Sequence, residues 1–178
     1  IAILVPCMRN TTGIATIGSE VRMLKEYARI MEFQYMNQFR LELRVDSRVE
    51  DYLAPVLFLQ PLVENSLIHG RNATTTMLTI CVSAHLVDDH VAISVEDNGE
   101  GMSTGRLREI SMDRETNIGK MRTFTSIGIA NIRERMALLY RNKPFSVDIA
   151  SVKNQGTVVR MCLPLVKEIA IDEENTSC

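Results

Sequence analysis

The chain has 178 residues, of which 46% are hydrophobic and 24% are charged, and its formal net charge at pH 7 is −2. This composition is typical of a soluble globular protein with one core of ordinary size, and it makes a second full domain improbable. The small negative charge argues against nucleic acid as a partner. The four cysteines, Cys7, Cys81, Cys162 and Cys178, are dispersed and form no CxxC pair, so neither a zinc site nor a disulfide framework is indicated. We therefore expect a reducing, cytoplasmic compartment.

Residues 1–18 are predicted to be an irregular N-terminal segment, and we assign no function to them. The apolar run at residues 1–5 is too short to span a bilayer and lacks the basic flank of a signal peptide. Because the chain opens on Ile1 rather than on an initiator methionine, we expect it to be a piece of a longer protein.

A helix is predicted over residues 19–39, capped by Ser19. Its apolar residues recur at spacings of three and four along one buried stripe: Val21, Leu24, Ala28, Met31 and Tyr35. This helix either packs on the edge of the domain or connects the domain to an upstream segment. Residues 41–45 then alternate apolar and charged side chains, which predicts a half-buried strand.

The stretch 59–70 predicts a helix with two distinct faces. One face is apolar and the other carries Gln60, Glu64, Asn65 and His69. A carboxylate beside a carboxamide, with an imidazole one turn on, could orient a metal and a proton acceptor in one place. On this stretch alone, a plainly solvated polar face explains the pattern equally well.

Proline and glycine mark the limits of this helix. We expect Pro55 at its first helical position, and Pro61 should kink the helix or mark a restart. Gly70 should end the helix in a left-handed conformation.

Two segments rich in β-branched residues, 75–86 and 90–97, predict a pair of strands joined by a turn. In the second strand, the alternation of apolar residues places Asp97 on the core-facing side. A carboxylate at the end of an apolar row must find hydrogen-bond donors or shift its pKa. A ligand amine would be a suitable donor.

The sequence Asn-Gly-Glu-Gly at residues 98–101 could form a hairpin turn. However, residues 102–112 have a helical pattern that Ser103 or Thr104 could cap, so no returning strand follows. Gly99 and Gly101 are then placed for close approach of the backbone to a ligand.

The polar segment 113–125 is typical of a mobile lid. Its Arg114, Lys120 and Arg122 could meet phosphate, although we favour their solvation. The next helix opens at residues 125–128 and buries Ile129, Ile132, Met136 and Leu139. Its free backbone N–H groups suit a phosphate, but every helix has such an end, and the signal alone is weak.

A last hairpin is predicted from strands 145–151 and 157–163, and it brings Thr157 to the edge of the core. Residues 166–178 are expected to form a solvated tail. The order of elements predicts an α/β fold: a two-layer sandwich of a mixed, mostly antiparallel sheet covered on one face by helices.

Over residues 19–165 the chain resembles the ATP-binding catalytic domain of sensor histidine kinases, in the GHKL superfamily and its LytS/YesM-like group. Residues 59–65 with His69 and Gly70 resemble the N box, and residues 97–102 resemble the first glycine box. Residues 126–136 are similar to the second glycine segment. The closing hairpin is matched by Gly156 and Thr157 with Leu163 and Pro164. By this resemblance, residues 40–165 form the ATP-binding domain and 19–39 a connector helix.

The resemblance implies a role for each matched residue. Asn65 would bind the magnesium ion that bridges the ATP phosphates, and Glu64 would polarise the attacking acceptor. Asp97 would accept the adenine amino group. The other cofactor-binding residues implied are His69, Gly99, Gly101, Met102, Gly128, Ile129 and Thr157. The implied partners are an upstream dimerisation domain with the acceptor histidine, a response regulator and a second subunit, in a parent protein anchored in the membrane.

Two positions differ from the family pattern. Ile68 stands where the family usually has a lysine that reaches the phosphates, and Ser126 replaces the first glycine of a Gly-x-Gly pair. No histidine of the chain lies on a dimerisation helix, so we expect ATP binding without self-phosphorylation. The alternatives are a degenerate nucleotide-sensing or scaffolding module and a GHKL-type ATPase or chaperone-like machine.

Overall fold

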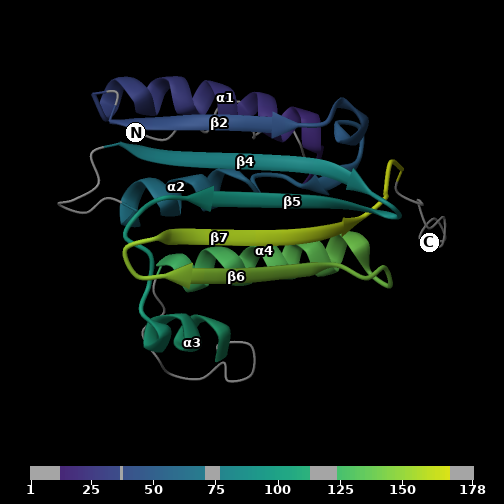
Figure 1. Cartoon of the computed structure of the whole chain (residues 1–178). Coiled ribbons are helices and arrows are strands. Elements are labelled where there is room, and N and C mark those ends of the chain that lie inside the picture. The colour runs from purple at the N-terminus through teal and green to yellow at the C-terminus, as the bar shows by residue number, and fades with distance from the viewer. Residues whose placement is uncertain (1–12, 37, 71–76, 113–123, 169–178) are drawn as a thin grey trace, which may run out of the picture.

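The computed structural model describes residues 13–36, 38–70, 77–112 and 124–168 (Figure 1). Its main sheet has five strands in the order β2-β4-β5-β7-β6. They are β2 (Phe39–Val45), β4 (Leu78–Val87), β5 (His90–Asp97), β6 (Ser146–Val152) and β7 (Gly156–Pro164). The edge strand β2 runs parallel to β4, and the other three pairs are antiparallel. The predicted mixed, mostly antiparallel sheet is therefore confirmed.

Three helices form the second layer: α1 (Ile17–Gln34), α2 (Gln60–His69) and α4 (Phe124–Tyr140). Figure 1 shows them behind the sheet, with α3 (Thr104–Met112) beyond its β6 edge. Alternate residues of the central strands face these helices and are buried, among them Ile80, Val82, Val91, Ile93, Val95, Val159 and Met161. None of the helices in the described ranges is long and apolar enough to cross a membrane.

The structure also contains a small two-stranded ribbon that the sequence pattern did not reveal, and its first strand directly precedes α1. Strand β1 (Ile14–Thr16) pairs antiparallel with β3 (Leu53–Pro55). Thr16 therefore stands directly before α1, and its Oγ1 accepts a hydrogen bond from the backbone N–H of Ser19 at 3.2 Å. The predicted cap at Ser19 is wrong, because the helix begins two residues earlier.

Pro55, Pro61 and Gly70 all differ from expectation. Pro55 ends β3, where its missing N–H costs no ladder hydrogen bond, and is not the first residue of a helix. Pro61 lies in the first turn of α2, which runs on as a single helix. Gly70 is right-handed, with φ of −75°. A Cβ atom at Gly70 would lie 2.4 Å from the carbonyl oxygen of Ser66, so close packing rather than a left-handed turn accounts for glycine there.

The predicted helix 19–39 instead spans Ile17–Gln34, and Phe39 opens β2. The remaining predicted elements are found within a few residues of their expected bounds. The strand 90–97 has the predicted bounds, and the buried positions of α4 include Ile129, Ile132 and Met136. The predicted lid, with Arg114, Lys120 and Arg122, lies outside the described residues apart from its last two positions, which open α4.

Candidate functional site

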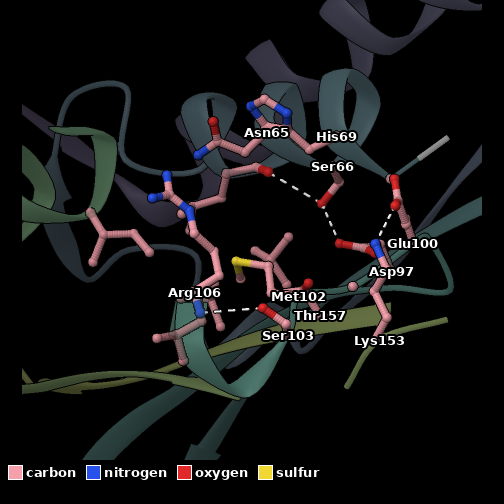
Figure 2. Close-up of a pocket in the computed structure, with 17 residues that line it drawn as sticks. Asn65, Ser66, His69, Asp97, Glu100, Met102, Ser103, Arg106, Lys153 and Thr157 are labelled. Carbon is pink, nitrogen blue, oxygen red and sulfur yellow. Dashed lines mark hydrogen bonds and ion pairs between the residues drawn. The ribbon is translucent and has the colours of Figure 1, made fainter. Parts of the chain in front are cut away.

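A pocket of about 680 Å³ lies where α2, the end of β5, the start of α3 and the β6–β7 hairpin meet (Figure 2). Its polar lining is Asn65, Ser66, His69, Asp97, Glu100, Ser103, Arg106, Lys153 and Thr157. Its apolar lining includes Leu62, Val95, Met102, Ile129, Ile149 and Val159. Apolar walls that carry polar groups are typical of a site for a small molecule.

Asp97 is the buried charge of this pocket. It ends β5 opposite Thr157 of β7 and is 8% exposed. One carboxylate oxygen accepts from the Ser66 hydroxyl at 2.8 Å, and the other accepts from the backbone N–H of Gly99 at 2.9 Å. Burial raises the pKa of Asp97 above its usual value, and these hydrogen bonds oppose the rise. The backbone of Thr157 also donates a hydrogen bond to this carboxylate. An ionised carboxylate has about four acceptor positions, so Asp97 can still receive an N–H from a ligand.

Ser66 is a site residue that the sequence interpretation missed. It lies on the buried side of α2 and is 7% exposed. Its hydroxyl connects α2 to Asp97 and also lies 3.3 Å from the carbonyl oxygen of Leu62 (Figure 2). The available signal was a hydroxyl within the apolar stripe of the helix, since a buried polar group needs a partner.

The predicted polar face of α2 divides between two environments. Asn65 and His69 line the pocket. Glu64 lies outside the pocket lining, and its Oε1 accepts from the Gln60 side chain at 2.8 Å. Successive helix residues point about 100° apart, so neighbouring side chains face different surroundings.

The start of α4 lies beside Asn65. A Cβ atom at Gly128 would be 3.4 Å from Nδ2 of Asn65, and Ile129 lines the pocket directly. The first described residues of α4 therefore lie at the side of the pocket that holds the Asn65 side chain. The side chain of Ser126 falls outside the described residues.

Gly99 and Gly101 are required by the protein's own backbone. A Cβ atom at Gly101, where φ is +61°, would lie 2.1 Å from the carbonyl oxygen of Val152. A Cβ atom at Gly99 would lie 2.4 Å from Cα of Gly70. Gly101 and Met102 line the pocket, whereas Gly99 contributes the N–H that holds Asp97. Chain packing thus gives these glycines a role that does not need a ligand.

Two cations that the sequence interpretation did not select line the rim. Lys153 of the β6–β7 turn forms an ion pair with Glu100. Arg106 pairs with Glu109 on α3 at 2.8 Å, and its side chain extends toward the side of the pocket that holds Asn65 (Figure 2). No sequence spacing relates these residues, because a hairpin and a helix bring them together. Within the described ranges, no group of three or more His, Cys, Asp or Glu residues could hold a metal ion.

A family model described as histidine kinase-, DNA gyrase B- and HSP90-like ATPase matches residues 50–167. Sensor histidine kinase YesM of Bacillus subtilis is 32% identical over 156 residues, which cover 88% of this chain and 25% of YesM. Sensor protein LytS of Staphylococcus epidermidis is 29% identical over 156 residues, which cover 88% of this chain and 25% of LytS. The chain therefore spans about a quarter of the length of these relatives.

Solved structures show the same fold. The catalytic domain of histidine kinase ThkA has a TM-score of 0.59 at 16% identity, over 86% of this chain and 95% of that one. The mycobacterial sensor histidine kinase MprB has a TM-score of 0.58 at 12% identity, and the match covers 86% of this chain and 97% of the MprB chain.

Proposed function

The chain belongs to the histidine kinase-, DNA gyrase B- and HSP90-like ATPase family as the ATP-binding catalytic domain of a histidine kinase, and from this premise we propose that it transfers the γ-phosphoryl group of ATP to a histidine on a dimerisation domain. That domain would precede it in a longer, dimeric protein anchored in a membrane. The phosphoryl group would then pass to a response regulator.

The buried carboxylate of Asp97 is the observation that supports this proposal most directly. It combines burial, an open acceptor position and an apolar pocket wide enough for a purine ring. The adenine amino group is a donor, so it would complete the hydrogen bonding of Asp97. Ser66 holds the carboxylate from α2, and Thr157 lies opposite it on β7.

The phosphates would extend toward Asn65. Figure 2 shows Asn65 and the Arg106 side chain on one side of the pocket and Asp97 on the other. Magnesium takes oxygen ligands and is usually held by one or two protein groups together with substrate phosphates, so the side-chain oxygen of Asn65 fits it. Bound magnesium would neutralise charge on the phosphates. Asn65 would orient the polyphosphate, and Glu64 would polarise the acceptor imidazole.

Calorimetry with ATP and GTP tests nucleotide recognition. We expect ATP to bind and GTP to bind at least about tenfold more weakly, because guanine presents an oxygen where adenine presents the amino donor. Two facing acceptors cannot form a hydrogen bond, so the position of the Asp97 carboxylate that adenine would fill stays without a donor. Equal affinity for the two nucleotides would contradict adenine recognition by Asp97. Transfer of radiolabelled phosphate to the parent protein's dimerisation domain then tests catalysis, and no transfer by a protein that binds ATP would favour the scaffold alternative.

The position of Ile68 makes Arg106 a candidate for contacting phosphate. Ile68 is 64% exposed and lies outside the pocket lining, whereas Arg106 lines the pocket. A phosphate oxygen could replace Glu109 as the partner of the Arg106 guanidinium. We expect Arg106→Gln to lower the affinity for ATP about tenfold and to leave the affinity for adenosine unchanged.

Titration of the variant with ATP, ADP and adenosine checks this expectation. The matched control is Arg108→Gln, which changes an exposed arginine of the same helix that does not line the pocket. An equal loss of affinity for all three ligands would show that the substitution changes the shape of the pocket, and it would contradict a contact between Arg106 and phosphate.

A further inference from the structure

One buried carboxylate has no part in the pocket. Within the described residues the buried polar or charged side chains are Glu20, Ser66 and Asp97, and the last two line the site. Glu20 lies in the first turn of α1 and is 2% exposed. Burying a carboxylate is costly unless donors satisfy it, so its partners indicate what it holds in place.

Glu20 holds the segment that leads into α2. Its two oxygens accept from the backbone N–H groups of Leu57 at 2.9 Å and Phe58 at 3.1 Å. Leu57 has a φ of +56°, a region that L-residues rarely adopt and that persists only when surrounding contacts enforce it. The carboxylate therefore stabilises an otherwise unfavourable backbone conformation.

Arg135 of α4 holds the other side of the same segment. Its guanidinium donates to the carbonyl oxygen of Leu57 at 3.2 Å and also to that of Val56. Burial has the largest effect on the pKa of Glu20 and raises it, whereas three backbone N–H groups and the positive charge of Arg135 oppose the rise. Side chains from two helices thus hold both the donors and the acceptors of this short segment.

The segment leads directly into α2. Leu59, the residue before α2, makes no side-chain cap, and the Glu20 carboxylate lies beside this uncapped start. A negative charge is favourable at a helix N-terminus. Because a helix of ten residues moves as a rigid unit, a shift at Phe58 displaces Asn65, Ser66 and His69 within the pocket.

A second contact between α1 and α2 lies further along. The pKa of Tyr27 is raised by burial and then by the nearby carboxylate of Glu64. Helix α1 therefore acts at two places: Glu20 holds the segment before α2, and Tyr27 lies near Glu64 of α2, which is proposed to polarise the acceptor. Yet α1 lies entirely outside residues 50–167, which the family model matches.

We propose that Glu20 is a positioning residue of the nucleotide site: together with Arg135 it sets the placement of α2, so that α1 determines the position of Asn65. This inference rests on the proposed binding of ATP. A displacement of α1 in the longer protein would then change nucleotide binding without any contact between α1 and the nucleotide.

The test compares Glu20→Gln with wild type by calorimetry of ATP in magnesium and in EDTA. A glutamine keeps the shape of the side chain but presents an NH₂ group to one of the two backbone N–H donors. We expect the affinity for ATP in magnesium to fall about tenfold. The ratio of the affinity in magnesium to the affinity in EDTA should also become smaller than in wild type. Glu26→Gln, which changes an exposed carboxylate of the same helix, should behave as wild type.

Two further variants separate position from stability. Arg135→Gln disturbs the same segment from α4 and should reproduce the loss, which keeps the test valid if Glu20→Gln does not fold. Val91→Ala removes buried volume from β5, far along the strand from Asp97, and should lower stability with normal ATP affinity. Normal affinity and magnesium gain in folded Glu20→Gln and Arg135→Gln would overturn the inference. Failure of wild type to bind ATP would instead overturn the proposed function.

Discussion

Replacing Asp97 with asparagine is expected to lower the affinity for ATP by about 10- to 100-fold, while the protein stays at least as stable as wild type. The adenine amino group is a donor, and a carboxamide that turns its own NH₂ toward the ligand cannot accept from it. The loss corresponds to one hydrogen bond between a charged acceptor and a donor in a buried site.

The fold should tolerate this change because the partners of Asp97 can be satisfied again. The amide oxygen can accept from the Gly99 N–H, and the amide NH₂ can donate to the Ser66 hydroxyl. That hydroxyl then turns to the carbonyl oxygen of Leu62, which already lies 3.3 Å away. The amide oxygen can also accept the hydrogen bond that the Thr157 backbone donates to Asp97, so the donors around this side chain keep an acceptor.

The raised pKa of Asp97 fixes the sign of the effect on stability. An acid whose pKa is higher in the folded state holds its proton more tightly there than in the unfolded chain. Its ionisation therefore lowers the free energy of unfolding as the pH rises from the usual value of 3.8 through the raised pKa. Above that window, Asp97→Asn removes this cost.

Calorimetry and urea unfolding of the same samples measure the two effects. Glu96→Gln is the control, because Glu96 precedes Asp97 on β5, is exposed and points to the opposite face of the sheet. In wild type, ATP affinity should also fall when the pH drops through the raised pKa of Asp97. Unchanged ATP binding in Asp97→Asn would rule out the proposed adenine contact.

Replacing Asn65 with alanine is expected to remove the contribution of magnesium to ATP binding and to slow phosphoryl transfer by at least about 100-fold. Phosphoryl transfer depends mainly on positioning and charge neutralisation, so loss of the group that orients the polyphosphate affects the rate more than the affinity. Alanine favours helix, and α2 should therefore keep its structure. Adenosine should bind normally, because Asp97 and Ser66 are unchanged.

ATP binding with magnesium and with EDTA, together with transfer to the parent protein's dimerisation domain, measures both effects. Asn131→Ala is the control, since this exposed asparagine of α4 does not line the pocket. Magnesium dependence that survives in Asn65→Ala would show that another residue holds the ion.

Much of the sheet could be predicted from alternation alone. The apolar alternation predicts the bounds of strand 90–97 correctly because Val91, Ile93 and Val95 are all buried on one face of the sheet. The same alternation placed Asp97 toward the core, where it is found. Strands of three residues, such as β1 and β3, carry too few positions for a period to show, so Pro55 was assigned to a helix.

The missed site residues share a physical cause. Arg106 and Lys153 reach the pocket from a helix and a hairpin that only the tertiary fold brings together. Glu20 is an acidic residue in a first helical turn, which is a common solvated position, and only its backbone partners 37 and 38 residues away distinguish it. Helical spacing selects Asn65 and Glu64 together and the resemblance gives each a role, whereas the structure shows that they face different surroundings.

The pairing of β5 with β7 also determines when the pocket can form during folding. The β4–β5 and β6–β7 hairpins join neighbours in sequence, and such local pairs form quickly. The β5–β7 pair joins distant segments and must close a long loop first. Asp97 meets Thr157 only through that pairing, so the nucleotide pocket is incomplete until β5 and β7 have joined. ATP should therefore prolong the life of the finished domain by slowing its unfolding, and it should leave the rate of folding unchanged.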